Sequence, residues 1–333
     1  MKKTLFGAAC LMVVSFVISA CLFSDNNPYN TIMFEGAGPA GMGNASMTFM
    51  NDNNAILYNP ACLADITGRI TSFECNVLKY NQDEYYSGDI SDVQGQISAV
   101  DNGFGVFMGS GISNVGGDIN DNAVLIILAR GFQINDRISV GASFKIGGPF
   151  NTNDTAGLGL DIACVIKAAD FLQIGIVWTN PVLFGNTLQA SQSFPQLFDN
   201  SDINAGFGIK LPTDTLIQFE AVDIFRQYTA SLFNESGSAT FHYNNREFEL
   251  GLRQKIGDNF RIRCGIDYGG YYYFTAGSFF GEAVRFSNFT ALTFGLGYDM
   301  RNYSMDAFVS SGINSGASYP ASERLGTGIK YYY

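Results

Sequence analysis

The sequence is poor in charge and nearly lacks histidine. Only 15% of its 333 residues are Asp, Glu, Lys or Arg, whereas an average soluble domain carries about 25%. The single histidine, His242, leaves little basis for a histidine-dependent catalytic triad, and the sequence has no G-x-S-x-G nucleophile elbow. After residue 20, no apolar run approaches the roughly 18 residues that a transmembrane helix needs. These absences argue against a soluble enzyme and against a membrane protein built from helices.

The charge that is present is mostly of one sign. The formal net charge is −11, and such an acidic chain repels nucleic acid because no basic patch offsets it. Acidic residues gather in stretches that we expect to be loops, such as 83–92. We interpret these stretches as solvated loop ends, since their spacing does not fit a divalent-cation loop. We therefore expect no nucleic-acid partner, no metal and no other cofactor.

Residues 1–20 are organised like a secretory signal peptide. Two lysines precede an apolar run over 5–18, and two small residues follow it. The stretch from Ile18 to Cys21 also resembles a bacterial lipobox, which would place a lipid on Cys21. A short apolar signal followed by a chance cysteine gives the same pattern, so both interpretations stay open.

Most of the remaining sequence alternates between apolar residues and small or polar ones. Segments 138–146, 158–167, 261–268 and 325–333 each place apolar residues on one face and Gly, Ser or charged residues on the other. A period of two with one apolar face is typical of a half-buried β-strand. We expect about fourteen such antiparallel strands in residues 69–333, without helices between them.

The connections between these segments alternate between tight and loose. This rhythm is typical of transmembrane β-barrels, which have short turns at one end and longer loops at the other. Closure removes unpaired strand edges, which a bilayer does not tolerate. The sequence therefore predicts an all-β fold, a transmembrane antiparallel β-barrel of about 14 strands. Tight connections are expected at Asp101-Asn102, Asn135-Asp136, Ala169-Asp170, Pro212-Thr213, Gly257-Asp258 and Arg301-Asn302, and looser ones at 81–90, 114–120, 151–154, 182–200, 227–240, 275–284 and 314–322.

Aromatic residues cluster near the ends of the expected strands, as at 271–274 and 331–333. Tyrosine sets its ring at the acyl boundary and its hydroxyl in water, so we interpret these clusters as interfacial girdles. A cage of rings that stacks on a ligand is the alternative. The final residue is Tyr333, and a terminal aromatic residue is typical of barrels inserted by the barrel-assembly machinery. We expect a monomer that lies in the lipid of a bacterial outer membrane.

The strand face opposite the apolar one would line the lumen, and it carries charges of both signs. We expect these charges to pair with one another or to meet water. The stretch from Ala123 to Ala129 differs because both of its faces are apolar, which predicts a greasy patch inside the barrel. The expected luminal polar residues are Glu74, Asn76, Asp161, Lys167, Glu247, Glu249, Arg253, Arg261, Arg263, Asp267, Asp306 and Lys330.

Four cysteines follow the signal region: Cys62, Cys75, Cys164 and Cys264. They form no C-x-x-C pair and have no metal-ligand spacing. The last three share the phase of apolar neighbours, so we expect them to be small lipid-facing residues. A disulfide between Cys62 and Cys75, which would tie the N-terminal segment to the wall, is a minor alternative.

Residues 21–68 lack sustained alternation and are rich in Gly, Asn, Met and Ala. We interpret them as a small plug, or hatch, that precedes the barrel. The stretch from Gly36 to Gly41 matches G-x-G-x-x-G. No buried strand precedes this motif and no alternation of strand with helix follows it, so we expect no dinucleotide site.

Residues 36–66 resemble the start of FadL-like outer-membrane proteins, including the PorV-like branch and its uncharacterised spirochaetal relatives. In that family the mature N-terminus runs roughly G-x-x-x-x-G-M-G-x-A, then an acidic and Asn-containing stretch, then A-x-x-x-N-P-A-G-L. Cys62 stands here where the family has Gly, which changes the expected local turn. The matching plug-motif residues are Gly41, Met42, Gly43, Asn59, Pro60 and Ala61.

The resemblance implies passive uptake of hydrophobic molecules, such as long-chain fatty acids, across the outer membrane. In the family a plug fills the lumen, and a kink in the third strand opens the wall towards lipid. The matching strand here would run from Gly103 to Gly111, although close packing against the plug would need the same glycines. The candidate lateral-opening residues are Gly103, Gly105, Gly109 and Gly111.

The expected loop 182–200 is rich in apolar residues. It could collect a hydrophobic ligand at the outer surface, or it could simply cap the barrel mouth. The residues of this candidate capture loop are Leu183, Phe184, Leu188, Phe194, Leu197 and Phe198.

Two other functions are compatible with a barrel of this kind. One is a structural or docking barrel, as in the PorV-like branch, which would anchor or shuttle secreted or surface proteins. The other is a water-filled porin, which the expected plug disfavours. A continuous greasy tunnel would favour transport, whereas a lumen sealed by paired charges would favour docking.

Overall fold

The computed structural model of the chain describes residues 34–80, 90–115, 118–149, 157–179, 202–222, 224, 227–234, 237–276, 283–314 and 322–333. From residue 69 onwards, the described sequence is mostly strand, and all of the strands belong to one antiparallel sheet. The strands are β1 Arg69–Tyr80, β2 Ile90–Asp101, β3 Phe104–Val115, β4 Asp118–Asn135, β5 Ile138–Pro149, β6 Gly157–Ala169, β7 Leu172–Thr179, β8 Asp202–Lys210, β9 Thr215–Val222, β10 Gln227–Asn234, β11 Gly237–Ile256, β12 Phe260–Ala276, β13 Ala283–Asp299, β14 Tyr303–Asn314 and β15 Ser322–Tyr332.

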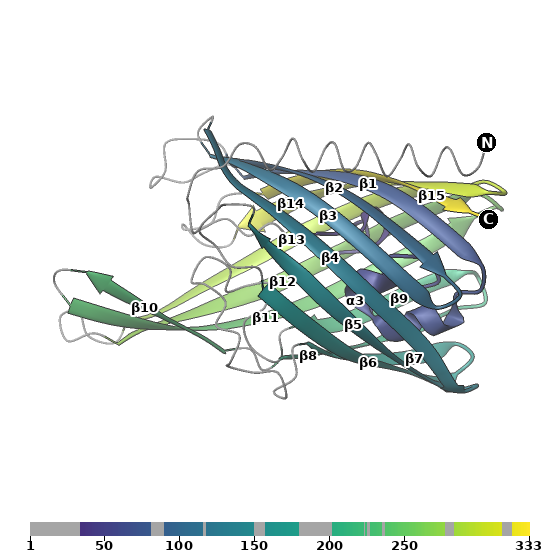
Figure 1. Cartoon of the computed structure of the whole chain (residues 1–333), viewed down its shortest axis with the longest axis horizontal. Helices are drawn as coiled ribbons and strands as arrows, with labels where there is room; N and C mark the ends of the chain where they lie inside the picture. Colours follow the sequence, from purple (N-terminus) through teal and green to yellow (C-terminus); the bar gives the residue numbers. More distant parts are fainter. Residues whose placement is uncertain are drawn as a thin grey trace.

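The sheet closes on itself to form a barrel (Figure 1). The first strand, β1, pairs with the last, β15, over residues 70–80. β9 and β10 pair with different parts of β11, so the described strands fill 14 positions around the barrel. The predicted fold, a transmembrane antiparallel barrel of about 14 strands, is confirmed.

Each of the six predicted tight connections joins two strands at one end of the barrel. In the first of them the turn residues are Asn102 and Gly103, one position later than predicted, and their φ angles are 48° and 80°. A two-residue hairpin turn with positive φ at both central positions matches the right-handed twist of the strands that it joins. The C-terminus lies at this same end (Figure 1), which we assign to the periplasm because barrels carry their short turns there.

Two of the predicted looser stretches are mostly strand. Stretch 114–120 is taken up by the ends of β3 and β4, apart from 116–117. Stretch 227–240 contains β10 and the start of β11, which pair as a hairpin that extends away from the barrel (Figure 1). The loop prediction was wrong there because each stretch contains two segments with alternating polar and apolar residues, and these two segments pair as a hairpin. The other five looser stretches lie wholly or largely outside the described residues.

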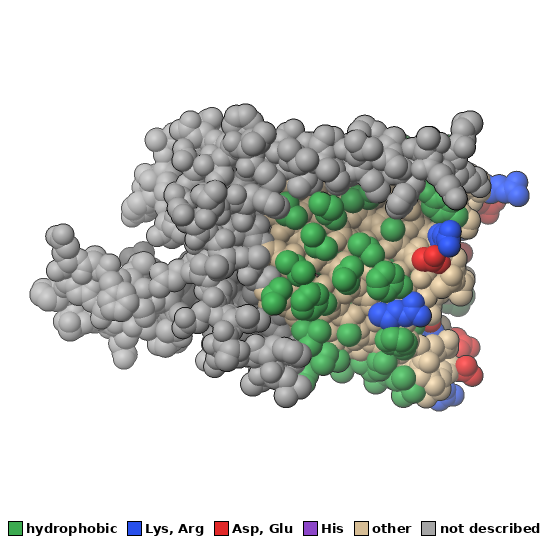
Figure 2. Space-filling view, viewed as in Figure 1, with side chains coloured by type: hydrophobic (Ala, Val, Ile, Leu, Met, Phe, Trp, Pro, Cys, Tyr) green, Lys and Arg blue, Asp and Glu red, His purple; other side chains and the backbone are tan. Residues whose placement is uncertain are grey.

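The exterior of the barrel is apolar. On β13, for example, Leu292, Phe294 and Leu296 are exposed while the residues between them are buried. Figure 2 shows such hydrophobic side chains spread over one face of the wall, with charged side chains near the short-turn end. An apolar surface of this extent suits contact with lipid. Among the described residues, no helix is long and apolar enough to cross a membrane.

Aromatic rings gather on the exterior near the short turns, as predicted for an interfacial girdle. The ring centroids of Phe260 and Tyr298 are 4.8 Å apart, and those of Tyr331 and Tyr333 are 4.6 Å apart. The exposure of Cys75, Cys164 and Cys264 follows the outward phase of their strands, as expected for lipid-facing residues, and all three are free thiols.

Residues 34–68, here named the luminal segment, lie inside the barrel near its short-turn end (Figure 1). The segment contains two short α-helices, α2 (Ala37–Ala40) and α3 (Ala55–Tyr58), and a 3-10 helix, η1 (Pro60–Asp65). Asn59 begins η1, because its side-chain oxygen accepts a hydrogen bond from Ala61 N at 3.0 Å. Pro60 follows at the first helical position, where its missing N–H costs nothing.

Candidate functional site

The interior of the barrel has an apolar side. Inward-facing residues of β1 to β4, β6 and β7 form one buried cluster with the luminal segment. In this cluster Ile56 and Leu63 come from the segment, and the rings of Phe34 and Phe107 meet edge to face with centroids 5.8 Å apart. We name the cluster's residues on β3, β4, β6 and β7 the apolar strip. They are Phe107, Leu125, Ile127, Ala129, Ala163, Val165 and Val177.

The apolar strip includes the greasy patch that the sequence predicts. Leu125, Ile127 and Ala129 of β4 are buried and face the lumen, while Ile126 and Leu128 between them are exposed on the outside. The luminal segment covers this patch, because η1 contacts β4, β5 and β6. Sequence analysis did not identify Ile56 and Leu63 as partners, since the luminal segment has no period that would mark an apolar face.

The four candidate lateral-opening glycines lie on or beside β3. Gly103 is in the turn that precedes this strand, with φ +80°. Gly105 and Gly109 face inward, where a Cβ atom would collide with the side chains of Ile56 and Phe34 respectively. Gly111, like the rest of β3, pairs with β2 and β4. These contacts show that Gly105 and Gly109 make room for the luminal segment; a side opening at β3 stays a prediction.

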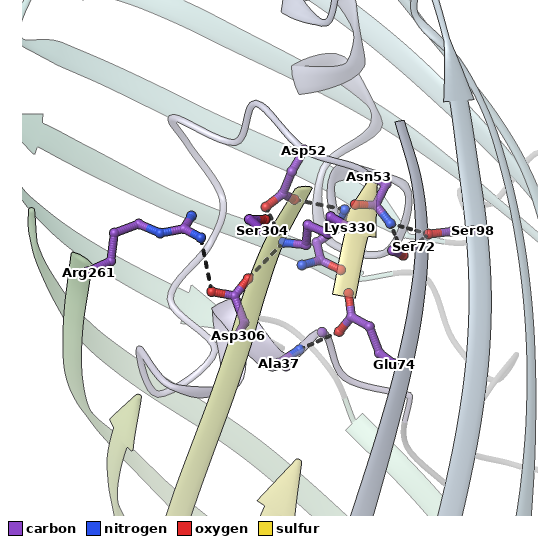
Figure 3. Close-up of polar contacts among 12 residues, drawn as sticks. Ala37, Asp52, Asn53, Ser72, Glu74, Ser98, Arg261, Ser304, Asp306 and Lys330 are labelled. Carbon is purple, nitrogen blue, oxygen red and sulfur yellow. Dashed lines mark hydrogen bonds and ion pairs between the residues drawn. The ribbon is translucent and has the colours of Figure 1, made fainter. Parts of the chain in front are cut away.

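The opposite side of the interior is polar and contains a buried ion network (Figure 3). Lys330 Nζ lies 2.5 Å from Asp52 Oδ2 and 3.3 Å from Asp306 Oδ2. Asp306 also pairs with Arg263 at 2.7 Å and with Arg261 at 3.2 Å. The network joins the luminal segment, through Asp52, to strands β12, β14 and β15.

Asp52 is the one member of this network that the luminal segment supplies. Burial raises the pKa of Asp52, but the Lys330 ammonium outweighs this effect and holds the pKa below its ordinary value. A hydrogen bond from Asn54 N to Asp52 Oδ1, at 2.9 Å, acts in the same direction. Asp52 is therefore ionised at neutral pH and stays paired with Lys330.

Wall side chains also satisfy the backbone of the luminal segment. Glu74 accepts a hydrogen bond from Ala37 N at 2.5 Å (Figure 3). Glu220 accepts two, from Ser46 N at 2.8 Å and from Met47 N at 3.2 Å. Irregular backbone inside a protein needs such partners, because an unpaired N–H or C=O away from water costs free energy. These bonds fix one seat for the segment in the lumen.

Several wall residues that hold the segment were not predicted from the sequence. Gln173 accepts a hydrogen bond from Phe49 N at 3.0 Å, and Gln218 donates to Thr48 O. Gln96 donates to Glu35 O at 2.9 Å. The sequence gives no local signal for these residues, because Gln and Glu on the inward phase of a strand also suit a wall that faces water.

The plug-motif residues lie where the segment passes closest to the wall. Gly41 ends α2 and lies against Gly295, where a Cβ atom would come within 3.0 Å of the Gly295 Cα. The backbone of Met42 and Gly43 passes close to β11 and β12. Asn59 donates to Met47 O at 2.8 Å, which ties the start of η1 to the preceding turn.

Cys62, which replaces the glycine of the family pattern, is buried in the lumen. Its thiol lies 3.7 Å from Met47 O, within reach of a weak hydrogen bond. Burial raises the pKa of Cys62 to about 12, so the thiol is protonated at neutral pH. The suggested disulfide with Cys75 is wrong, because both residues are free and Cys75 lies on the outward phase of β1.

The predicted luminal polar residues lie on the inward phase of their strands, and each of them is buried or half-buried. Along β11 and β12 their charges are separated by level. Basic residues lie nearer the short turn, acidic residues lie nearer the other end, and a glycine pair divides them. In order from the turn, successive inward pairs include Arg253 with Arg263, Gly251 with Gly265, and Glu249 with Asp267.

Two predicted features lie outside the described residues. One is the hydrophobic capture loop, 182–200, with all of its named apolar residues. The other is Cys21, the proposed lipidation site, together with the expected signal peptide. Both stay predictions.

No protein-family model and no curated protein sequence matches the chain. Solved structures do match its fold. A Pseudomonas aeruginosa FadL homologue aligns with TM-score 0.58 and 14% identity over 90% of this chain and 99% of that chain. The Pseudomonas putida toluene transporter TodX aligns with TM-score 0.56 and 12% identity over 92% and 99%. The CymD monoaromatic hydrocarbon channel aligns with TM-score 0.54 and 12% identity over 90% and 97%.

At these low identities the likeness establishes a shared fold, that of an outer-membrane barrel. The neighbours agree with the FadL-like resemblance of residues 36–66. The PorV-like branch is not represented among these three structures, so that part of the resemblance stays a prediction.

Proposed function

We propose that the protein is an outer-membrane channel for the passive uptake of hydrophobic molecules. The fold supports this proposal, because it is shared with proteins described as a toluene transporter and a monoaromatic hydrocarbon channel. The interior supports it too, because one side of the lumen is lined by the apolar strip.

The apolar strip is the observation on which the proposal rests. An apolar molecule gains about 0.8 kcal/mol for each CH₂ group that it transfers from water to such a surface, whereas a polar solute gains nothing. Ile56, Leu63 and Phe34 of the luminal segment cover the strip. A hydrophobic ligand that displaces one of these side chains replaces apolar contacts with others of the same kind, so the exchange costs little.

The finer proposal concerns the substrate and its route. Long-chain fatty acids are the substrates that the FadL-like resemblance implies. They would be captured at loop 182–200, pass beside the luminal segment along the apolar strip, and leave near β3. The glycine-rich composition of β3 supports an exit there, because glycine-rich strands bend easily.

The docking function is not favoured. The three structural neighbours are described as a FadL homologue, a transporter and a channel. Paired charges fill the polar side of the lumen, but the apolar strip faces them across the luminal segment, so the interior is not sealed by charge alone.

Uptake by vesicles tests the proposed function. Folded protein is placed in lipid vesicles, and entry of a labelled long-chain fatty acid and of toluene is measured against protein-free vesicles. We expect wild-type protein to accelerate entry. Ile127→Ser, on the apolar strip, should slow it several-fold, whereas Ile126→Ser, the adjacent residue on the lipid side, should not. Acceleration for toluene alone would restrict the substrates to hydrocarbons, and acceleration for neither compound would overturn the proposal.

A further inference from the structure

A row of carboxylates crosses the inner wall on three neighbouring strands. Glu220 of β9 lies directly opposite Glu249 of β11, and Glu249 lies directly opposite Asp267 of β12. All three side chains face inward, and the residues are only 3%, 5% and 4% exposed. Like charges directly opposite each other destabilise a sheet. A row of this kind therefore needs a compensating charge.

A fourth carboxylate, that of Glu247, lies beside the row, and together with two members of the row it forms a close group of three. Glu247 is two residues from Glu249 on β11 and so faces the same side. One carboxylate oxygen from each of Glu247, Glu249 and Asp267 lies within 4.8 Å of the other two. Oxygens that bind one Ca²⁺ at about 2.4 Å are separated by at most about twice that distance. The spacing of the three side chains is therefore compatible with a single shared ion.

The hydrogen bonding of Asp267 points to a missing electropositive partner. Its Oδ1 atom is buried and accepts no hydrogen bond from the described residues. An unsatisfied buried oxygen is rare in a native protein and often marks an ion or a water. The carboxylates of Glu247 and Glu249 lie close to that of Asp267, so a cation at this point would both meet the oxygen and offset the three charges.

Two basic residues of the described part of the lumen are paired with acids outside the row. Arg263 pairs with Asp306 at 2.7 Å, below the glycine pair that divides the two charge levels. Arg324 pairs with Glu35 at 2.5 Å, and its charge also acts on Asp267, so it offsets the row only in part. Glu220 receives the two N–H groups of Ser46 and Met47, which hold it against the luminal segment.

We propose that Glu247, Glu249 and Asp267 bind one hard divalent cation, with Ca²⁺ as the best match. Carboxylate oxygens without nitrogen or sulfur ligands suit Ca²⁺, Mg²⁺ or Mn²⁺. Ca²⁺ tolerates irregular geometry and bidentate carboxylates, whereas Mg²⁺ demands a near-ideal octahedron. Water would complete the shell on the side of the lumen. The site is independent of what the channel transports.

The cation would also affect the luminal segment. Glu249 links the site to Glu220, and Glu220 holds the backbone of Ser46 and Met47. A bound cation would reduce the repulsion between these carboxylates, which belong to the part of the wall that contacts the segment. Bound cation should therefore stabilise the folded protein as a whole.

Calorimetric titration of folded, detergent-solubilised protein with Ca²⁺ tests the proposal, after removal of metals with a chelator. We expect one ion per chain, with a weaker response to Mg²⁺. Glu249→Gln and Asp267→Asn should each weaken binding by on the order of tenfold or more. Asp258→Asn, which removes an exposed carboxylate in a short turn, is the matched control and should bind Ca²⁺ like the wild type.

Thermal unfolding gives a second measurement, which remains informative if a substitution at the site changes the stability of the protein. In chelator, Glu249→Gln should melt at or above the wild-type temperature, because it removes repulsion. With Ca²⁺ the wild type should gain stability by mass action and the variant should not. Equal gains in both proteins, absence of Ca²⁺ binding to the wild type, or stabilisation by acid alone would overturn the proposal. Stabilisation by acid alone would indicate protons shared among the carboxylates.

Discussion

Lys330 of the last strand forms an ion pair of 2.5 Å with Asp52 of the luminal segment, across a sequence separation of 278 residues. The side chain of Lys330 is 1% exposed and also lies 3.3 Å from Asp306. Removing one partner of a buried pair leaves the other charge without compensation, which costs much more than the pair itself is worth. This network is therefore expected to be the most sensitive part of the seat.

We expect Lys330→Met to destabilise the protein by about 3–5 kcal/mol, because Asp52 and Asp306 lose their shared cation. The matched control is Arg69→Met, since Arg69 pairs with Asp101 at 2.9 Å but the two side chains are 69% and 45% exposed. That pair should contribute at most about 1 kcal/mol. Denaturant unfolding in detergent micelles measures both values. Similar losses in the two variants would contradict the assignment of Lys330 as the centre of a buried network.

Acid should weaken the seat of the luminal segment through Asp52. The folded pKa of Asp52 lies below its ordinary value of 3.8, so its ionised form contributes stability above that value. The contribution is lost as the pH falls through the folded pKa. The stability difference between wild type and Asp52→Asn should therefore be largest near neutral pH and shrink as the solution is acidified below 3.8. A difference that grows on acidification would show that Asp52 is protonated in the folded protein.

Gly131→Ala should destabilise the barrel because this inward glycine touches the backbone of η1. A Cβ atom there would lie 2.8 Å from Pro60 O and 2.9 Å from the carbonyl carbon of Leu63, and backbone atoms cannot rotate away. Overpacking of this kind typically costs about 1–3 kcal/mol. At Gly38 the nearest atom would be 3.6 Å away, so Gly38→Ala is the control. Equal unfolding midpoints for the two variants would show that η1 can shift away from the wall.

The thiol of Cys62 should resist alkylation for as long as the luminal segment stays seated. It is buried, and its pKa is raised to about 12, so little thiolate exists near neutral pH. Mass spectrometry after iodoacetamide treatment should find Cys62 unmodified in folded protein and modified after unfolding. Rapid modification of the folded protein would mean that the segment leaves its seat on the timescale of the reaction.

Most of the wall could be predicted from the sequence because its signals are local. A period of two indicates which residues face lipid. Turns such as Asn102-Gly103 can be recognised because Asn-Gly is a preferred pair in tight hairpin turns. The β10–β11 hairpin was harder to predict, since polar residues among its strands resemble a loop. The pattern of β10 indicates a strand only if the start of β11 is also recognised as its pairing partner.

The seat of the luminal segment could not be predicted in the same way. Glu220 holds Ser46 from a distance of 174 residues in the sequence, and Gln173 holds Phe49 from 124 residues away. Nothing local distinguishes these wall residues from others that face water. Inward phase could be assigned residue by residue, but which partner each side chain meets depends on how the whole barrel curves around the segment.

The pairing of β1 with β15 constrains how the protein can be assembled. The luminal segment precedes every strand in the sequence, yet Lys330, which completes its binding site, is on the last strand. The binding site of the segment is therefore complete only after the two ends of the chain have met. If the barrel closed before the segment was inside, the segment would be left outside the lumen. The pairing of the first and last strands would then have to open again before the segment could enter.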